Sequence, residues 1–556
     1  AVFLLNREEH FFSPTGGGIV LVTRWVRLNT PTAVEELGEL ELPSDAVVVE
    51  VHTRKPNGSV YPPSATPQKS SFSLRNLEPG DTVEFRYLLS HPPIAGMPTR
   101  TWSRRFFFAH RVFPTVLAQW ILHAPPGVQP RILTQGNLPS PQQTNDAYGS
   151  HFLLSLWMRE PQPNEVRMTQ FIPQSVRAHA GFEENDVYAL LAEENPRIEW
   201  DSWELQTLAK RLCPQKTMDC IARTAWWVQT HIRQENTNER PGHILERRAG
   251  SRSHLLYALL HHEGFTPRIA LSRPERTAIA DDNWPDPQDY PIILVHIPGF
   301  GFIDTRFSYL PPGHVVPALA GAKALLLSGK RDIATLDAAR PQRRRLEIRV
   351  RLHADHSAKV SLRETAHGFF AVQKLEQIKG LSLQELKERI QTDSLRKTFP
   401  GAQVQSARWR HITPQSDDLE LHVQFTAPSV SVATNGGFEI RRMGFPWNLA
   451  QRYLVFSTRK TDFLPDSLPT THVEIVMDPP SGFHIENAPD LEVSSRFGYI
   501  RRRLHKDGKN ARLIIEKHLE TTIVHVSEWK DFADFCRNFD EIETLPIQMV
   551  PLPVNP

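Results

Sequence analysis

The sequence predicts a multidomain α+β protein, with β-rich regions at both ends and a mixed α+β region between them. Its 556 residues are too many for one hydrophobic core. The residue pattern turns from strand-like to helical near position 180, and strands return near position 340. Proline is abundant, at 46 residues, which suits many strands joined by tight turns. We therefore place the domains at 1–176, 177–335 and 341–556.

The first region is expected to be an antiparallel β-sandwich. The stretch VVVEVHTRKPNGSVY holds two strand-like runs around a Pro-Asn-Gly turn, which is a strong hairpin signal. The stretch SFSLRNLEPGDTVEFRYLL predicts a second hairpin, with Glu78–Asp81 as its turn. Val83, Phe85 and Tyr87 alternate with polar residues, as in a half-buried sheet. A second layer would cover the apolar face of that sheet.

The central region opens with helices. The run ELQTLAKRLCPQKTMDCIARTAWWVQTHI predicts two helices separated at Pro214, with Trp226 and Trp227 in the core. A further helix is predicted in SHLLYALLHHEG, because leucine pairs recur there at helical spacing, with Ser253 as a plausible N-cap. Two strand-like runs, TPRIALS and YPIILVHIPGFGFIDT, follow it and complete an α+β unit.

The third region is expected to be β-rich. LEIRVRL and AKVSLRETA predict strands, LSLQELKERIQTD a helix, and the Asp507-Gly508 pair a hairpin turn. The run Arg343–Arg345 is interpreted as a solvated linker or strand edge rather than a binding patch. His353–His356, which reads HADH, has metal-ligand residue types. Its place between two strand runs favours a turn instead.

Composition excludes several classes of function. The net charge of +2 is too small to attract nucleic acid electrostatically. No apolar run approaches the roughly 20 residues of a transmembrane segment. Three cysteines are too few for a disulfide framework, so Cys213, Cys220 and Cys536 are expected to be buried structural residues. We find no phosphate loop, no spaced Cys/His zinc signature and no serine-elbow motif, and therefore expect no cofactor and no metal.

The central region resembles the transglutaminase-like core, a relative of the papain-like cysteine proteases. In that family a cysteine opens a buried helix, and a histidine and an aspartate lie on the following strands. The leucine pairs at 255–256 and 259–260, with Gly264, match the spacing of that helix. RIALS matches the next strand, and IILVHIPGFGFIDTRFSYL matches the later strands with the aspartate. The segments KPNGSV and NLEPGDTVEF resemble a β-domain of unknown function that precedes such cores in bacterial envelope proteins.

The resemblance implies that the catalytic triad is degenerate. The cysteine position falls on Ala249, the histidine position falls on Pro291 or Ile292, and only the aspartate is kept, as Asp304. At a strand end, Asp304 can also persist by accepting backbone N–H bonds in the following turn. The implied protein is a non-catalytic scaffold or interaction component. Its partners would be other proteins of a bacterial envelope assembly, in the periplasm or cell envelope.

Two other interpretations stay open. The first is a hydrolase or acyltransferase that uses Ser251 or Ser253 with His254 or another histidine brought in by the fold, although capping and helix-surface roles are the simpler explanation of these residues. His296 lies too far along its strand to replace the missing base. The second alternative is peptidoglycan or carbohydrate binding in the relict cleft, with Trp284 as an aromatic platform.

Overall fold

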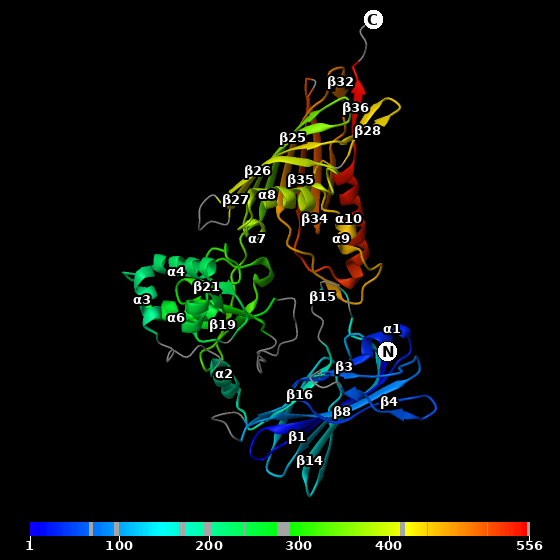
Figure 1. Cartoon of the computed structure of the whole chain (residues 1–556), viewed down its shortest axis with the longest axis vertical. Coiled ribbons are helices and arrows are strands. Elements are labelled where there is room, and N and C mark those ends of the chain that lie inside the picture. Colours follow the sequence, from blue (N-terminus) through cyan, green and yellow to red (C-terminus); the bar gives the residue numbers. More distant parts are fainter. Residues whose placement is uncertain are drawn as a thin grey trace. The chain divides into compact units, whose positions relative to one another are not determined.

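The computed structural model combines several β-sheets with helices, so the chain is a multidomain α+β protein (Figure 1). It describes residues 1–556 except 66–70, 94–98, 164, 166–167, 170–172, 194–201, 238, 275–289, 412–417, 442, 509 and 553–556. Two compact units are present. The first comprises 1–166 with 170–187, and the second comprises 167–169 with 188–556.

The first unit is built on one eight-stranded sheet with the order β13-β14-β11-β1-β2-β8-β4-β5. Strands β1 and β11 run parallel, and the other neighbours in the sheet run antiparallel. The strands are β1 (Val2–Phe12), β2 (Gly18–Arg27), β4 (Val47–Arg54), β5 (Val60–Tyr61), β8 (Thr82–His91), β11 (Thr115–Ala124), β13 (Gln142–Asp146) and β14 (Gly149–Arg159).

Two smaller sheets share apolar clusters with this large sheet. Leu40 and Leu74, from the region of the β3-β7-β6 sheet, pack with Val22 of β2. Phe106 and Val176, from the β10-β16-β12 sheet, pack with Trp120 of β11. The smaller elements are α1 (Pro31–Leu37), β3 (Glu39–Glu41), β6 (Ser64–Ala65), β7 (Ser71–Ser73), β9 (Thr101–Trp102), β10 (Phe106–Phe107), β12 (Pro130–Gln135) and β16 (Ser175–Ala180).

The two predicted hairpins of this unit have different outcomes. The Pro-Asn-Gly hairpin is confirmed, because Gly58 takes φ +89° in the turn between the paired strands β4 and β5. The segment Glu78–Asp81 is also a turn, in which the Asp81 N–H donates to the Glu78 carbonyl. The hairpin predicted around it is wrong, because β7 and β8 belong to different sheets. The turn carries the chain from one sheet to another.

In the central part of the second unit, helices α3 to α6 lie beside an antiparallel sheet whose described strands have the order β21-β20-β19-β22-β23. Both Trp226 and Trp227 are only half-buried, so their predicted place in the core is wrong. The core side of their helix is formed by smaller residues such as Ala225 and Val228. The elements are α3 (Trp203–Leu212), α4 (Met218–His231), α5 (Pro241–Arg247), α6 (Arg252–His262), β19 (Arg268–Ser272), β20 (Ile292–Ile297), β21 (Gly301–Ile303), β22 (Lys323–Leu326) and β23 (Ile333–Thr335).

The rest of the second unit is built on a second eight-stranded sheet, with the order β26-β27-β25-β24-β31-β35-β34-β33. Its strands are β24 (Arg343–Leu352), β25 (Ala358–His367), β26 (Gln403–His411), β27 (Asp418–Ala427), β31 (Thr470–Asp478), β33 (Leu491–Ser495), β34 (Gly498–Asp507) and β35 (Asn510–Leu519). A four-stranded sheet lies beside it, composed of β28 (Ser431–Thr434), β29 (Gly437–Ile440), β32 (Phe483–Ile485) and β36 (Ile547–Pro551).

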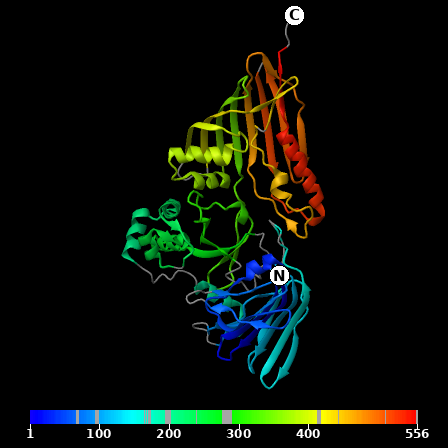
Figure 2. The same ribbon diagram turned by 45° about the vertical axis from the view of Figure 1, so that its right-hand side comes forward.

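Helices cover one face of the second eight-stranded sheet (Figure 2). Leu386 of α8 and Phe539 of α10 belong to the same apolar cluster as Ile348 of β24. The helices are α7 (Phe369–Ile378), α8 (Leu383–Arg389), α9 (Leu449–Tyr453) and α10 (Trp529–Thr544), and a π-helical segment, η3 (Ile390–Leu395), continues α8. Among the described residues, no helix has the length and apolar character that a membrane span requires.

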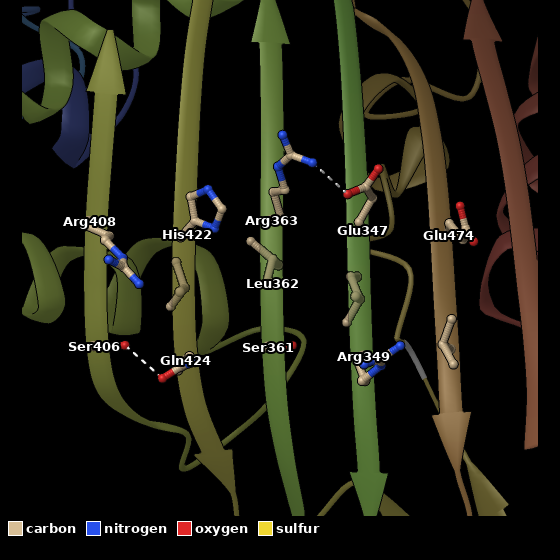
Figure 3. Close-up of a pocket in the computed structure, with 13 residues that line it drawn as sticks. Glu347, Arg349, Ser361, Leu362, Arg363, Ser406, Arg408, His422, Gln424 and Glu474 are labelled. Carbon is tan, nitrogen blue, oxygen red and sulfur yellow. Dashed lines mark hydrogen bonds and ion pairs between the residues drawn. The ribbon is translucent and has the colours of Figure 1, made fainter. Parts of the chain in front are cut away.

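The opposite face of the sheet is polar (Figure 3). Ion pairs and hydrogen bonds link neighbouring strands there. Arg363 donates to Glu347 at 3.3 Å, and Ser406 donates to Gln424 at 3.2 Å.

Three local predictions for this region have mixed outcomes. Arg343–Arg345 begins strand β24, which pairs with β25 on one side and β31 on the other, so the linker or edge interpretation is wrong. The turn at His353–His356 is confirmed, and His356 takes the left-handed position at φ +69°. The Asp507-Gly508 hairpin between β34 and β35 is also confirmed.

Candidate functional site

The candidate site surrounds the first turn of α6. The buried face of this helix matches the predicted spacing, because all four leucines at 255–256 and 259–260 are fully buried. Ser251, not Ser253, is the N-cap, and its Oγ accepts a hydrogen bond from the His254 N–H at 3.4 Å. The prediction that Ser253 caps the helix is therefore wrong by two residues, since Ser253 already lies in the first turn.

Ala249 lies before the helix rather than at its start. It belongs to a two-residue strand, β18 (Ala249–Gly250), that pairs in parallel with β17 (Arg233–Gln234). The next residue, Gly250, takes φ +141°, and a Cβ there would lie 2.7 Å from Ile244. The chain therefore makes a close passage against α5 before it enters α6.

Ser253 is committed to internal hydrogen bonds. It is 4% exposed, and its Oγ donates to the Ile293 carbonyl at 3.1 Å and lies 2.9 Å from the Thr305 hydroxyl. The Ile293 carbonyl can only accept, so the Ser253 proton serves that bond and the Thr305 hydroxyl donates to an Oγ lone pair. These bonds join α6 to β20 and to the turn after β21.

Arg252 was not predicted as a site residue, yet its hydrogen bonds connect the segments that form the site. Its side chain is buried and donates to the Ile232 carbonyl at 2.6 Å, to the Thr305 carbonyl at 3.1 Å and to Ser308 Oγ at 3.2 Å. Burial lowers the pKa of this guanidinium. An arginine among the polar residues of RAGSRSH gives no sequence signal for this role, because the carbonyls that it binds come from distant segments.

Asp304 is buried and paired with an arginine two residues further on. Its Oδ1 accepts from the Arg306 backbone N–H at 3.1 Å and from Nε at 2.9 Å, while Oδ2 accepts from Nη2 at 2.6 Å. The expected backbone N–H bond in the following turn is thus present. The bidentate pair occupies both carboxylate oxygens, so the carboxylate orients a guanidinium instead of an imidazole.

A cleft of about 470 Å³ lies beside the first turn of α6. Ser251, Ser253 and His254 contribute to its wall, whereas Ala249 and Asp304 are not among its lining residues. The remaining lining residues are the polar Gln234, Asn236, Thr237 and Arg306, together with Ile269, Leu271, Tyr290, Pro291, Ile293 and Leu327. The structure therefore brings the predicted serines and histidine into one cleft, whereas the predicted triad positions Ala249 and Asp304 do not line it.

The two candidates for the histidine position lie in different surroundings. Pro291 is exposed and lines the cleft, whereas Ile292 is 7% exposed and belongs to an apolar cluster. His296 lies further along β20, with its ring 4.7 Å from Phe302, and burial lowers its pKa. Trp284, the proposed sugar platform, lies outside the described residues.

His254 is the imidazole of this cleft. It is 6% exposed, and burial lowers its pKa to about 4, so its ring is neutral at pH 7. Among the described residues, its Nδ1 makes no hydrogen bond, and none of the hydrogen bonds joins the ring to Ser251 or Ser253. A nucleophile needs such a bond to its base for activation.

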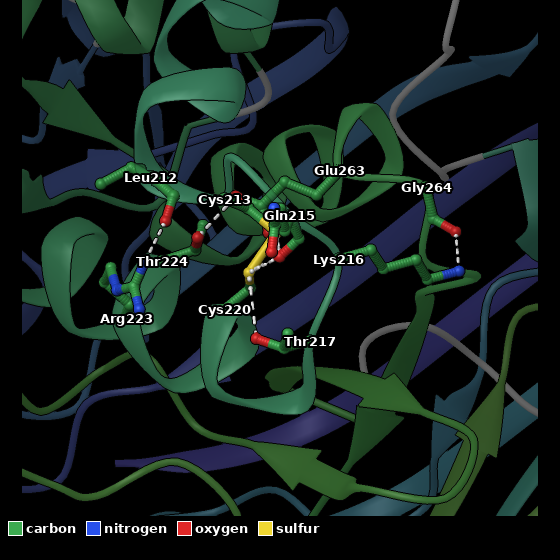
Figure 4. The surroundings of a disulfide bond; sticks show 10 residues. All are labelled: Leu212, Cys213, Gln215, Lys216, Thr217, Cys220, Arg223, Thr224, Glu263 and Gly264. Carbon is green, nitrogen blue, oxygen red and sulfur yellow. Dashed lines mark hydrogen bonds between the residues drawn. A yellow bond between two sulfur atoms is a disulfide. The ribbon is translucent and has the colours of Figure 1, made fainter.

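The cysteine predictions are partly wrong (Figure 4). Cys213 and Cys220 form a disulfide that joins the end of α3 to the first turn of α4, with their Cα atoms 5.2 Å apart. The helix break at Pro214 was predicted, but the pairing of the two cysteines across it was not. Cys536 is a free, fully buried thiol in α10, as expected, and burial raises its pKa.

Next to the disulfide, polar contacts fix the far end of α6. The Thr224 hydroxyl donates to Glu263 Oε1 at 2.5 Å, and Lys216 Nζ donates to the Gly264 carbonyl at 2.6 Å (Figure 4). Burial raises the pKa of Glu263 to about 7. The helix that carries the cleft residues is therefore anchored at both ends.

Comparison with known proteins gives the fold and not the family. The sequence matches no family model and no curated protein. Among solved structures, it is similar to a protein from Parabacteroides distasonis that is described provisionally as a protease, with a TM-score of 0.67 at 13% identity. The similarity covers 99% of each chain. At that identity the likeness shows a shared fold over the whole chain and does not carry over an activity.

Proposed function

We propose that the chain is a transglutaminase-like protein without catalytic activity, with flanking β-domains, that binds other proteins of a bacterial envelope assembly. One observation carries the proposal: Asp304, the remaining member of the triad pattern, is engaged on both carboxylate oxygens by Arg306. In a catalytic triad the carboxylate accepts from the imidazole, whereas the side-chain partner of Asp304 here is the Arg306 guanidinium.

Two further features of the cleft support binding rather than turnover. Pro291 lines the cleft at the expected histidine position and has no group that accepts a proton. His254 has a pKa of about 4, far below the range near neutral pH in which a general base is effective.

The cleft has the chemistry to bind an extended peptide segment of a partner protein. Ile269, Leu271 and Leu327 give it an apolar wall for side chains. The Gln234 and Asn236 amides line the same cleft, and side-chain amides can both donate to and accept from a peptide backbone.

The disulfide supports the proposed periplasmic or cell-envelope location. Disulfides form and persist in oxidising compartments and are rare in the cytosol of mesophilic cells. Because Cys213 and Cys220 are joined in this structure, the chain suits a compartment outside the cytosol.

Peptide display tests the binding proposal. Peptides selected against the whole chain should lose at least tenfold in affinity when the exposed cleft residue Asn236 is replaced by Trp, which fills the cleft entrance. The matched control is Gln215→Trp, an equally exposed position outside the lining residues, which should change the affinity less than twofold. Equal loss in both variants would contradict the proposal.

A repair experiment tests the absence of catalysis. Ala249→Cys alone should not hydrolyse or transamidate glutamine-containing peptides, because a thiol at position 249 lies outside the cleft lining and has no base. The double variant Ala249→Cys/Pro291→His should be weakly active at best, because Arg306 still occupies Asp304. Turnover by the single variant well above the parent would refute the proposal.

One observation favours a second candidate function, a serine hydrolase. Ser251 caps α6 and shares the cleft with His254, and helix N-terminal N–H groups can stabilise an oxyanion. A fluorophosphonate probe discriminates the two functions. Labelling of the whole chain that Ser251→Ala abolishes and Ser253→Ala does not would establish the hydrolase, whereas the non-catalytic proposal expects no labelling.

A further inference from the structure

A second cleft, of about 660 Å³, lies far from α6 in the sequence, between α7, η3 and the segment 445–452. We call it the C-terminal cleft. Among the described residues that line it, four are basic, namely Arg344, Lys374, Lys397 and Arg452. Three half-buried aromatic rings complete its wall, namely Phe370, Phe445 and Trp447.

The two inner cations share a single carboxylate. Arg344 Nε donates to Glu364 Oε1 and Lys374 Nζ donates to Glu364 Oε2, both at 2.7 Å. Glu364 is 3% exposed, whereas the Arg344 and Lys374 side chains keep 15% and 22% of their surface exposed and line the cleft. One buried carboxylate balances only one of the two cations, and the cluster keeps one positive charge that an anion can neutralise.

The other charged residues of the cleft add a second positive charge that no carboxylate balances. Arg452 pairs with Asp466 at 2.8 Å, and the lining residue Asp393 pairs with Arg389 at 3.2 Å. Lys397 is exposed and has no ion pair within the described part of the chain. Among the described lining residues and the side chains that form ion pairs with them, five cations therefore stand against three carboxylates, a net charge of +2.

Aromatic rings hold the inner cations in position. The Arg344 guanidinium lies over both Phe370 and Phe445, 5.6 and 5.7 Å from the ring centres, and Lys374 Nζ lies 5.3 Å from the centre of Phe370. Trp447 stacks on Phe539 at 5.5 Å on one side. The cleft thus has cations whose side-chain freedom is already restricted, which lowers the entropic cost of binding an anion.

The backbone around the cleft is unusual and is held rigidly. Phe445 and Asn448 take φ +52° and +51°, a region that non-glycine residues rarely adopt and that clusters at functional sites. The π-helical segment η3 contributes Asp393 and Ser394, and π-helical turns are also frequent at functional sites. Beneath the segment, the buried Lys517 donates to the Phe445 carbonyl at 3.0 Å.

We propose that the C-terminal cleft binds an anionic saccharide, that is, a sugar ring carrying a carboxylate or a phosphate. The basic side chains match the anionic group. The aromatic rings carry the inner cations on their faces and add an apolar wall for the C–H groups of a sugar ring. The polar lining residues Ser394, Thr398, Asn448 and Gln451 match its hydroxyls. The cleft is several times larger than a bare phosphate requires. The proposal does not depend on the function proposed for the cleft at α6.

Calorimetric titration of the whole chain tests this proposal with four probes: trigalacturonate, glucose 6-phosphate, neutral maltotriose and inorganic phosphate. One of the two anionic sugars should bind at least tenfold more tightly than both maltotriose and inorganic phosphate, and the preferred one identifies the anion. Raising the salt concentration should weaken that binding, because the recognition is electrostatic.

Charge reversal at the cleft provides the matched pair of variants. Lys397→Glu should weaken binding of the anionic sugar at least tenfold. Arg396→Glu makes the same charge change at the neighbouring exposed position, which is not a lining residue, and should change it less than twofold. Both positions are exposed, so both variants should fold, which circular dichroism checks.

Three results would overturn the proposal. The first is the absence of binding by both anionic sugars at millimolar concentration. The second is binding of maltotriose or inorganic phosphate as tight as that of the anionic sugars. The third is an equal effect of Arg396→Glu and Lys397→Glu, which would indicate a general surface charge effect.

Discussion

Glu263 should make the central part of the chain less stable as the pH rises. It lies at the end of α6, is 9% exposed and accepts a hydrogen bond from Thr224 at 2.5 Å. Burial raises its pKa from an ordinary 4.5 to about 7, against the opposing effects of Thr224 and Arg223. The folded state therefore holds this proton more tightly than the unfolded state does.

The direction and the size of this pH effect on stability follow from the difference between the pKa values of Glu263 in the folded and unfolded states. Below pH 4.5 the carboxyl is protonated in both states, and its full contribution to stability is present. As the pH rises through 7 the folded state must lose the proton and bury a charge, so that contribution is lost. Each tenfold step in proton affinity is worth about 1.4 kcal/mol, and 4.5 to about 7 spans two to three steps, so the loss is about 3 kcal/mol.

The variant Glu263→Gln removes the charge and keeps an oxygen that accepts from Thr224. It should match the parent within about 0.5 kcal/mol at pH 4.5 and exceed it by about 2–3 kcal/mol at pH 8.5. Because a multidomain chain need not unfold in one step, hydrogen exchange of peptides from α4 and α6 is the suitable measurement. The control is Glu246→Gln, at an exposed position on α5. The reasoning is refuted if Glu263→Gln has the same effect at both pH values.

Three further changes test the supports of the cleft at α6. Arg252→Met should destabilise the central part by more than about 2 kcal/mol in hydrogen exchange of peptides from α6, because it leaves buried carbonyls without their donor; stability unchanged from the parent would contradict this role. Replacing Cys213 and Cys220 by Ser should cost about 2 kcal/mol for so short a loop, and reduction of the parent should give the same loss. Gly250→Ala should lower the melting temperature, because its Cβ would lie 2.7 Å from Ile244, whereas Gly299→Ala, with no atom within 4 Å, should show only the backbone strain of its positive φ.

Several parts of the fold were predictable because their causes are local. The leucine spacing of α6 reports its buried face directly, and the turns at Gly58 and Gly508 need a conformation that glycine adopts at little cost. The turn at His353–His356 was predicted from its place between two strand runs, and a histidine occupies the left-handed position there.

The candidate site was predictable only in outline. The sequence placed Ser251, Ser253 and His254 near one another, and they do share a cleft. It could not place Ala249, because the register of a helix does not fix where the helix begins. The capping serine and the bridge between β17 and β18 set that start, and the bridge pairs residues that are distant in sequence.

The sequence by itself determined the helices, hairpins and turns, because their hydrogen bonds and apolar patterns involve residues that are close together in the chain. The tertiary structure alone decided which sheet each strand joins, that Cys213 and Cys220 meet, and that Arg344 lies in a cleft instead of a solvated linker. The physical reason is the same in each case. The energy of a buried ion pair or of a layer of side chains depends on partners that are distant in the chain, and one sequence does not say which partners meet.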